Sequence, residues 1–417
     1  MNMQSKKVLI IDCGGLFPEM GVRMARDAAS VKYYSEWRDD FPGIDKAKVG
    51  EGLDGIERVD NYEDYLDNSD LIVSPDTMTG PLVEFLKKHD YPVAGPGRAE
   101  WLENNRWDAK KFQKDSGLPI QESNRVVGIS ALRNFLKDKK NYYIKIDKYR
   151  AVMESFKHTD ATNTEQELDA IAVKLGPFKE DIVFVVEEFL EGEEPGLDGI
   201  SWEGDLLYPC QIGYEAKGVG VIERTYNTAN ELPEPAKQVN AGLSKAFKKD
   251  KFRFFFSSEF KLGKDRNPFV IDNTIRLAAP GTSSIQYEII KNYTAVMHGL
   301  ATGVKVNPII TDKYGIAIAG ESPVAEKRYL NVSFPKEMRQ WIKLRHAVKR
   351  GKDYFATPGL PSVVTVIALG NTIDETLNTL EARTKEVKAS SLNFAVDDLR
   401  KLKDSINKAK AYGLSPF

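Results

Sequence analysis

Apolar runs and amphipathic stretches alternate through the first 118 residues. Residues 7 to 12 (KVLIID) contain a continuous apolar run between Lys7 and Asp12, a pattern typical of a strand buried on both faces of a parallel sheet. Further strands are expected at 71–74 and in YPVAG, and helices at 19–29, 62–65 and 81–88. The strand–loop–helix order predicts a doubly wound α/β domain over residues 1–118.

Ligands of such sheets bind at the carboxyl ends of the strands, so this edge is the candidate site of the first domain. It is expected to carry Gly14, Gly15, Asp76 and Gly95. The alternative is that they are simply turn residues, because Gly and Asp are common in turns. The turn at 13–15 lacks GxGxxG, so a Rossmann dinucleotide site is not favoured.

The middle of the chain mixes both periodicities and predicts α+β lobes. Four helices are expected: one at 98–115, which carries Arg106, one capped by Ser130, one that runs from a capping box at Thr164 to Leu175, and one at 234–249. Strands are expected at 142–146, 181–188, 197–202 and 206–212. Lys145 is the single charge in the strand YYIKI, where a lysine usually faces solvent. Residues 213–227 are charged, aperiodic and glycine-containing, which indicates a substrate loop.

The stretch from Phe254 to Thr282 predicts a β-hairpin with an acidic residue on each strand. Glu259 lies near the middle of the first strand, and Asp272 lies near the end of the second. A hairpin can place two such carboxylates side by side, where a hard divalent cation can bridge them. The alternative is an exposed charged hairpin. A long helix is expected after it, from Ser283 to Leu300.

The last 90 residues change character. Nine Lys or Arg occur among residues 327–352, which indicates a solvated or domain-packing face, with an anionic ligand as the alternative. A buried strand ending at Gly370, a helix opened by a capping box at Thr372, and a final helix at 395–411 complete the chain.

Composition narrows the function classes. Apolar residues make up 41% and charged residues 29%, and the 59 basic and 61 acidic residues nearly cancel, so neither nucleic acid nor a membrane surface is indicated as a partner. Cys13 and Cys210 lack metal-ligand spacing and are expected to be core residues. The four histidines are scattered singly along the chain and form no clustered motif. The first apolar run is too short for a signal or a span, so we expect a cytoplasmic protein.

Four pieces in this order resemble the ATP-grasp ligases: Lys145 on a strand, EEFLEGEE at 187–194, Glu259, and Asp272-Asn273-Thr274. Within that superfamily the chain is most similar to phosphoribosylamine–glycine ligase, in DLIVSPD, in YPVAGPGRAEWLENNRWDAKKFQKDSGLPI, in VVEEFLEGEE, in NPFVIDNTIR and in VTVIALGNTIDETLNTLEART. The resemblance implies an ATP-grasp fold with a pre-ATP-grasp domain at 1–118, a small lobe at 119–192, a large lobe with the metal hairpin at 193–325, and a C-terminal α+β domain at 326–417.

The resemblance also implies roles for particular residues. Arg106 and Lys145 would hold the phosphates of ATP; the segment Glu187, Glu188, Phe189 and Leu190 would clamp adenine, and Glu193 would accept the ribose hydroxyls. Glu259 and Asp272 would hold Mg²⁺ (or Mn²⁺) with Asn273 or Thr274, and strand alternation favours Thr274. Arg276 would bind the γ-phosphoryl group or a substrate carboxylate. Substrates would lie near Gly14, Gly15, Asp76, Lys217, Gly281 and Thr282.

The implied reaction is ATP-dependent ligation of a small acid, such as glycine or another amino acid, to a small amine that is phosphorylated or nucleoside-like. An acyl phosphate would be the intermediate. Three segments depart from the family pattern: DKYRAVMESFK has no glycine where the family has a glycine-rich lid, YEAKGVGVIERTYN replaces its substrate loop, and Ala279 to Thr282 is more similar to D-alanine–D-alanine ligases. The alternatives are a nucleotide-binding relative without ligase activity and an ATP-dependent phosphoryl transferase, and the chain could be a monomer or a dimer.

Overall fold

The N-terminal domain contains a five-stranded parallel sheet. The structure is a computed structural model that describes residues 2–36, 49–148 and 155–417. The strand order is β3-β2-β1-β4-β5, and every neighbouring pair is parallel. The bounds are β1 Lys7–Ile11, β2 Ser30–Tyr34, β3 Glu57–Val59, β4 Leu71–Val73 and β5 Val93–Ala94. This confirms the predicted parallel α/β sheet.

Of the helices expected in this region, the one at 81–88 is confirmed, and the others are shorter than expected. The first, α1, ends at Met24 (Pro18–Met24), because turns over 25–29 lead into β2. The second, α2, spans Gly80–Lys88, and the helix expected at 62–65 is a 3-10 turn, Glu63–Tyr65. The predicted helix 98–115 is broken at Asn105, whose φ of −122° and ψ of 76° are not helical, into α3 (Trp101–Asn104) and α4 (Arg106–Asp115).

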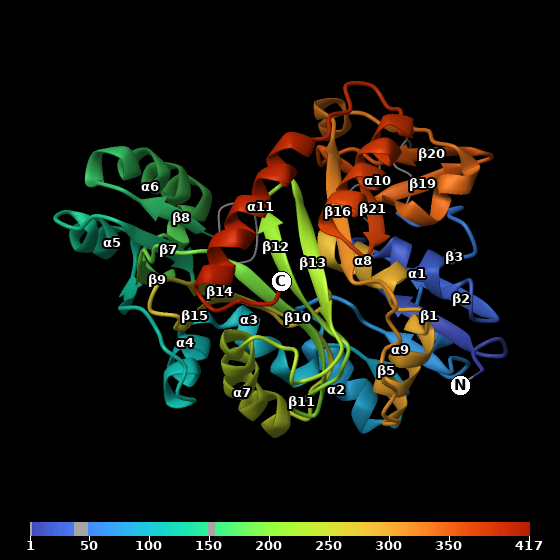
Figure 1. Ribbon diagram of the computed structural model, residues 1–417, viewed down its shortest axis with the longest axis horizontal. Helices are drawn as coiled ribbons and strands as arrows, with labels where there is room; N and C mark the ends of the chain where they lie inside the picture. Colours follow the sequence, from blue (N-terminus) through green and yellow to red (C-terminus); the bar gives the residue numbers. More distant parts are fainter. Residues whose placement is uncertain (1, 37–48, 149–154) are drawn as a thin grey trace.

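A small antiparallel sheet with its own core forms a separate lobe, seen at the left of Figure 1. Its order is β6-β9-β7-β8, with β6 Ser123–Val127, β7 Tyr142–Ile146, β8 Ser155–His158 and β9 Val183–Glu188. Helix α5 (Ile129–Leu136) begins after Gly128 and not at Ser130, which instead bonds Glu180. Helix α6 (Ala161–Leu175) begins four residues earlier than the predicted cap at Thr164 implies, because Asp160 caps it by accepting from the Asn163 amide.

The largest sheet has nine strands and continues across the expected boundary at 325/326. Its order is β15-β14-β10-β12-β13-β16-β21-β18, and β11 pairs with β10. The bounds are β10 Pro195–Trp202, β11 Asp205–Leu206, β12 Cys210–Ala216, β13 Gly220–Tyr226, β14 Arg253–Leu262, β15 Pro268–Thr274, β16 Tyr314–Glu321, β18 Ile342–Leu344 and β21 Ser362–Gly370. Helix α7 spans Glu234–Lys249.

Two predictions for this region were wrong. Residues 213–227 are not an aperiodic loop but most of the regular hairpin of β12 and β13, with a short turn at 217–219. The single helix expected from Ser283 to Leu300 is two helices, α8 (Gly281–Ile289) and α9 (Tyr293–Thr302), separated at 290–292 where Ile290 is extended. The predicted hairpin of β14 and β15 is confirmed.

A smaller sheet and two helices complete the C-terminal part. The strand order is β17-β20-β19, with β17 Leu330–Val332, β19 Ala347–Arg350 and β20 Asp353–Ala356. Helix α10 (Ile373–Glu386) is capped by Thr372 as predicted, and α11 spans Val396–Ala411. Of the described helices, none is long and apolar enough to cross a membrane.

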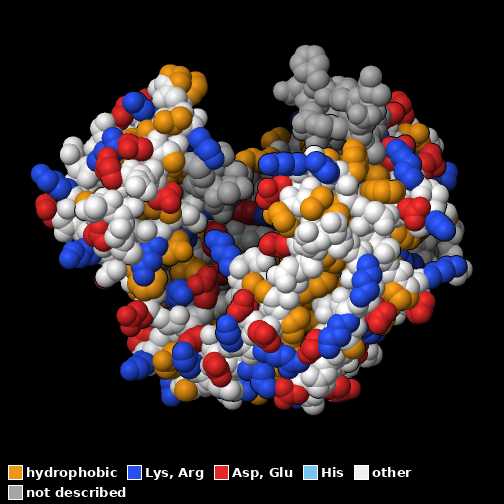
Figure 2. Space-filling view, turned by 90° about the horizontal axis from the view of Figure 1, so that it is seen from above, with side chains coloured by type: hydrophobic (Ala, Val, Ile, Leu, Met, Phe, Trp, Pro, Cys, Tyr) orange, Lys and Arg blue, Asp and Glu red, His pale blue; other side chains and the backbone are white. Residues whose placement is uncertain are grey.

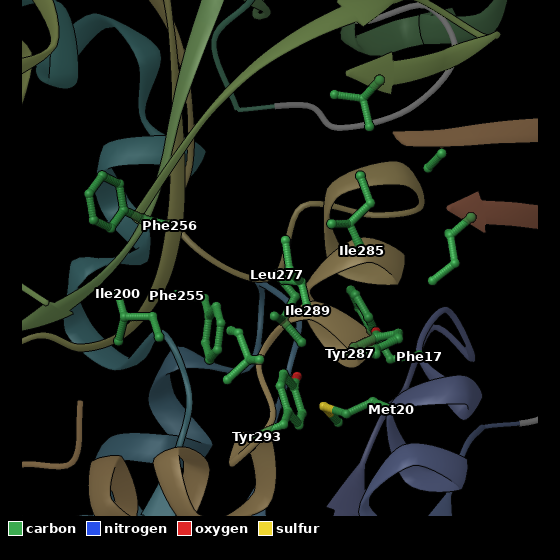
Figure 3. Close-up of a cluster of buried hydrophobic side chains, with 14 of the residues drawn as sticks. Phe17, Met20, Ile200, Phe255, Phe256, Leu277, Ile285, Tyr287, Ile289 and Tyr293 are labelled. Atoms are coloured by element: carbon green, nitrogen blue, oxygen red, sulfur yellow. The ribbon is translucent and has the colours of Figure 1, made fainter. Parts of the chain in front are cut away.

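Helix α8 joins the N-terminal domain to the large sheet. Its Tyr287 lies beside Phe17 of the first domain, and Ile285 and Leu277 lie toward the sheet (Figure 3). All four side chains are buried almost completely. The domain that carries Gly14 and Asp76 is therefore held against the hairpin domain by a shared apolar core.

The basic stretch 327–352 is in part a domain-packing face. Arg339 makes a bidentate pair with Glu19 at 2.9 and 3.0 Å and reaches Asp54 at 2.7 Å, and Lys343 pairs with Glu288 at 2.5 Å. Lys349 also bonds Asp54. These acids come from the N-terminal domain and α8, so three of the nine basic residues pack this stretch against the rest of the molecule. Five others are exposed: Lys327, Arg328, Lys336, Arg350 and Lys352.

We expect Arg339→Ala to lower the free energy of unfolding by about 3 kcal/mol or more, because Glu19 would be left buried without its partner. Arg350→Ala is the matched control, since its pair with Glu51 is exposed and worth about 1 kcal/mol or less. Urea unfolding followed by fluorescence measures both variants. Equal losses would contradict the packing role of Arg339.

Candidate active site

Two cavities meet at the β14–β15 hairpin. The larger has a volume of about 360 Å³ and the smaller about 170 Å³. Four charged side chains line both: Glu194, Lys217, Glu259 and Asp272. Figure 2 shows the molecule hollowed between the small lobe, at its left, and the rest, with acidic and basic side chains along the rim. The predicted metal carboxylates thus lie where the two cavities join.

Glu259 and Asp272 are directly opposed in the antiparallel register of the hairpin. A β-bulge follows Glu259, between it and Phe260. Burial raises the pKa of Glu259 well above its usual value, and the charges of Asp272, Glu215 and Glu194 raise it further. The pair is thus a concentration of negative charge that a bound cation would stabilise.

Thr274, and not Asn273, shares the cavity with these carboxylates. Thr274 lines the larger cavity, as strand alternation indicates, whereas the Asn273 side chain is buried and accepts a 2.9 Å hydrogen bond from the Ser258 hydroxyl. The structure therefore does not bring Asn273 to the carboxylate pair. In the described part of the chain, no group of three or more His, Cys, Asp or Glu side chains is arranged to hold a metal by itself.

Lys145 does not face solvent, contrary to the usual position of a lysine in a strand. It is buried, donates to the Ile271 carbonyl at 2.5 Å, and lies 3.2 Å from Glu187. Burial disfavours its charged form, but Glu187 and Asp272 outweigh this and raise its pKa. The charged ammonium is thus fixed at the wall of the smaller cavity.

Lys110, which the sequence reasoning missed, lies on the other side of Glu187. Its Nζ is 2.9 Å from Glu187 and donates to the Val270 carbonyl at 3.0 Å. The buried Glu187 keeps a lowered pKa despite its burial because both lysines stabilise the carboxylate. The available signal was the spacing of four residues from Arg106, which places both side chains on one face of α4.

Arg106 is the first residue of α4 and is also buried. It donates to the Ile146 carbonyl at 2.7 Å, and its guanidinium lies 4.0 Å from Asp272. Arg106 and Lys145, the two predicted phosphate ligands, therefore approach Asp272 from different elements.

The segment expected to contact adenine lies at the smaller cavity, but Glu193, expected at the ribose, does not. Glu187, Glu188, Phe189 and Leu190 line the smaller cavity. The amides of Glu188 and Phe189 already donate to the carbonyls of Glu122 and Asn141, so these two amides are not available to a base. Glu193 lines neither cavity and instead bridges to Leu262 and faces Lys408; the neighbouring Glu194 lines both.

Arg276 connects the hairpin to the rim of the first domain. Its Nε is 3.1 Å from Asp76 and 3.2 Å from Glu103, a buried acid that the sequence reasoning missed. Glu103 also accepts from the Ile275 amide at 2.7 Å, which fixes the end of β15. Although burial opposes it, these acids raise the pKa of Arg276, so its guanidinium is held charged at the wall of the larger cavity.

The remaining predicted substrate residues divide into two groups. Lys217, Gly281 and Thr282 line the larger cavity, and Gly14 lies beside Asp76, since a Cβ on Gly14 would be 3.4 Å from Asp76 Oδ2. Gly15 has a φ of +64° and packs against Val49, so it shapes the turn, and it lines neither cavity. Of the segment DKYRAVMESFK, residues 149–154 lie outside the described residues.

The floor of the larger cavity is formed by residues that were not predicted from the sequence. Asp198 and Glu215 line it from strands β10 and β12, and Glu321 and Arg345 line it from the C-terminal side. A lone charged residue in or next to a strand usually faces solvent, so the sequence pattern does not distinguish these four residues.

The sequence matches no protein-family model and no curated protein, but the structure is similar to solved enzymes. The phosphoribosylamine–glycine ligase of Thermotoga maritima has a TM-score of 0.71 at 18% identity, over 93% of this chain and 98% of that one. The biotin carboxylase domain of Hydrogenobacter thermophilus 2-oxoglutarate carboxylase, crystallised with Mg·ADP and bicarbonate, has a TM-score of 0.70 at 12% identity, over 98% and 96%. The chain therefore has the ATP-grasp fold.

A third solved enzyme is also similar in structure. The L-amino acid ligase of Bacillus licheniformis has a TM-score of 0.62 at 15% identity, and the match covers 94% of this chain and all of that one. At these identities the similarity establishes the shared fold and leaves the reaction to be argued from the site.

We expect Asp198→Asn to stabilise the protein at pH 8. Burial raises the pKa of Asp198 to about 7, so the folded state loses stability as the pH rises from about 4, the ordinary aspartate value, through about 7. The uncharged variant avoids this loss, and its melting temperature at pH 8 should exceed that of the wild type by about 2 °C or more.

Below about pH 4 the two melting temperatures should coincide, because Asp198 is then protonated in both the folded and the unfolded states. Asp138→Asn, an exposed site, is the control and should change neither value. A destabilised Asp198→Asn variant at pH 8 would contradict the buried, uncompensated state of this carboxyl group.

Proposed function

We propose that this protein is an ATP- and Mg²⁺-dependent carboxylate–amine ligase. The observation that carries the proposal is the junction of the two cavities at Glu259 and Asp272. The smaller cavity is lined by basic groups and by the apolar residues Phe189 and Leu190, which suit a nucleotide. The larger cavity is lined by Arg276, which suits an anionic group. Two of the three enzymes compared above are named as ligases, a phosphoribosylamine–glycine ligase and an L-amino acid ligase, which supports this class.

In this proposal ATP binds in the smaller cavity. Phe189 and Leu190 would contact adenine, Glu194 would take the place proposed for Glu193 at the ribose, and Lys145 and Arg106 would hold the phosphates. Positive charge fixed before the nucleotide arrives needs little reorganisation, and it stabilises the charge that develops during phosphoryl transfer.

The donor set at the junction fits magnesium. Mg²⁺ is usually held by one or two carboxylates together with phosphate oxygens, so Glu259 and Asp272 suffice once ATP is present. Thr274 would add a neutral oxygen. The raised pKa of Glu259 fits the same assignment, since a cation would relieve the repulsion between the carboxylates. When bound, the ion would neutralise the negative charge of the transferred phosphoryl group.

The chain's own residues would then support two steps. Arg276, held by Asp76 and Glu103, would orient the acid so that a carboxylate oxygen attacks the γ-phosphorus, giving an acyl phosphate and ADP. The amine would attack the acyl carbon, release inorganic phosphate and lose a proton to form the amide. Lys217, which lines both cavities, would stay close to the transferred phosphate.

The general test is to incubate the protein with Mg·ATP, single acids and hydroxylamine, a small uncharged amine. Formation of ADP and a hydroxamate with one class of acid would support ligation. ADP formed without any acid would contradict it, as would no ADP with any acid.

We expect Asp272→Asn to reduce acid-dependent ADP release by about a hundredfold or more, because one of the two carboxylates for the ion is lost. Asp265→Asn in the exposed turn of the same hairpin removes the same charge and should retain wild-type turnover. Turnover is measured as ADP release at saturating ATP. Unchanged turnover of Asp272→Asn would refute the metal assignment.

We expect Lys145→Met to weaken ADP binding by about tenfold or more, the loss of one charge-assisted hydrogen bond. Calorimetry with Mg·ADP measures the affinity, and Lys140→Met, at an exposed position before the same strand, is the control. Equal affinities for both variants would reject the phosphate role of Lys145.

A further inference from the structure

Two buried carboxylates under the floor of the larger cavity are not used by the chemistry above. Asp198 lies on β10 and Glu223 on β13, and their exposed fractions are 3% and 0%. Among the described side chains, Asp198 Oδ1 and both Glu223 carboxylate oxygens have no well-formed hydrogen bond. Buried charge without a partner is costly, so such a pair is an unusual feature of a large sheet.

Strand β12, between them, leaves room for the two carboxylates to approach each other. Gly213 faces Glu223 in the register of β12 and β13, and a Cβ there would lie 3.1 Å from Asp198 Oδ2 and 3.3 Å from Glu223 Cγ. A larger residue at position 213 would therefore separate the two acids.

Asp198, Gly213 and Val221 line the cavity, so this face of the sheet is its floor. Glu223 lies on the same face as Val221, two residues along β13. Ser257 contacts Asp198, and Thr282 lies near Glu223. Asp198 thus faces the space where a substrate would lie, and Glu223 lies beside it on the same face of the sheet.

Asp198 lies close in the sheet to the Glu259 carboxylate of the proposed metal site. Gly196 is opposite Glu259 in the register of β10 and β14, and Asp198 is opposite Ser257, two residues further along. Two residues of a strand span about 7 Å, the length of a small substrate. A small substrate held at Asp198 could therefore reach the acid substrate that would be activated at the hairpin.

The charges around the cavity favour a cation at this place. Besides the hairpin acids, Asp198, Glu215 and Glu321 line the cavity, whereas its basic side chains are Lys217, Arg276 and Arg345. Arg276 is already compensated by Asp76 and Glu103. Burial raises the pKa values of Asp198 and Glu223, as expected for acids that lack a counter-ion in the unliganded protein.

We propose that Asp198 and Glu223 bind the amine substrate as a primary ammonium cation, that one of the two carboxylates takes a proton from it so that the neutral nitrogen can attack, and that this substrate carries no phosphate group. The proposal rests on the ligase function proposed above, and it narrows the amine from the phosphorylated or nucleoside-like compound that the sequence suggested. The ammonium would replace the missing hydrogen-bond partners of the two acids.

Calorimetry on the full chain with Mg·ADP tests the proposal directly. The probe is 1,4-diaminobutane, compared with the uncharged 1,4-butanediol and with O-phosphoethanolamine. We expect saturable binding of the diamine, and binding weaker by about tenfold or more for the other two. Asp198→Asn and Glu223→Gln should each weaken diamine binding by about tenfold or more, whereas Glu326→Gln, an exposed acid, should not.

The proposal is overturned if the diamine does not bind saturably, if phosphoethanolamine binds as tightly, or if both variants bind the diamine like the wild type. Mg·ADP affinity verifies that each variant is folded. The hydroxylamine assay keeps the two proposals separate: diamine binding without any hydroxamate would refute the ligase and retain the cation site. Hydroxamate formation without diamine binding would retain the ligase and refute the cation site.

Discussion

The register of the β14–β15 hairpin is the constraint on which the rest of the site depends. By pairing Glu259 with Asp272, it places two carboxylates together where the nucleotide-sized cavity meets the substrate-sized one. Two such charges repel each other, and burial increases the cost. A slip of one residue would turn Asp272 to the face that Asn273 now occupies and remove the pair from the cavity.

The surrounding basic groups are held by acids of their own. Glu187 lies between Lys110 and Lys145, and Arg276 is held by Asp76 and Glu103. The pKa values of Lys145 and Arg276 are raised by these acids although burial opposes it, so positive charge is in place before a substrate binds. Such preorganised charge is the condition for effective electrostatic stabilisation of a transferred phosphoryl group. Because Asp76 belongs to the first domain, the core around α8 and the Arg339 pairs also position the site.

The sequence predicts the architecture well where periodicity is strong. Continuous apolar runs identify β1, β4 and β9, and the paired strands around residues 263–268 identify the hairpin. The break between α8 and α9 is hidden because apolar residues continue through Ile289 and Ile290. The hairpin of β12 and β13 is hidden because buried Glu223 and the glycines interrupt its alternation.

The candidate site is predictable only in part, for a physical reason. Glu259, Asp272, Thr274 and Arg276 are close in sequence, so local strand geometry places them together. Lys110, Glu103 and Asp198 reach the site only through tertiary packing, and an isolated charge in a helix or strand resembles a solvent-facing residue until its partners are known. The same packing leaves Asn273 and Glu193 outside both cavities.

The most direct measurement of the central claim follows an oxygen atom through the reaction. An acid that supports ADP formation is labelled with ¹⁸O in its carboxylate, and the inorganic phosphate released with Mg·ATP and an amine is analysed by mass spectrometry. Activation through an acyl phosphate predicts one ¹⁸O atom in each phosphate released, because the carboxylate oxygen that attacked phosphorus leaves with it. Unlabelled phosphate would contradict the account.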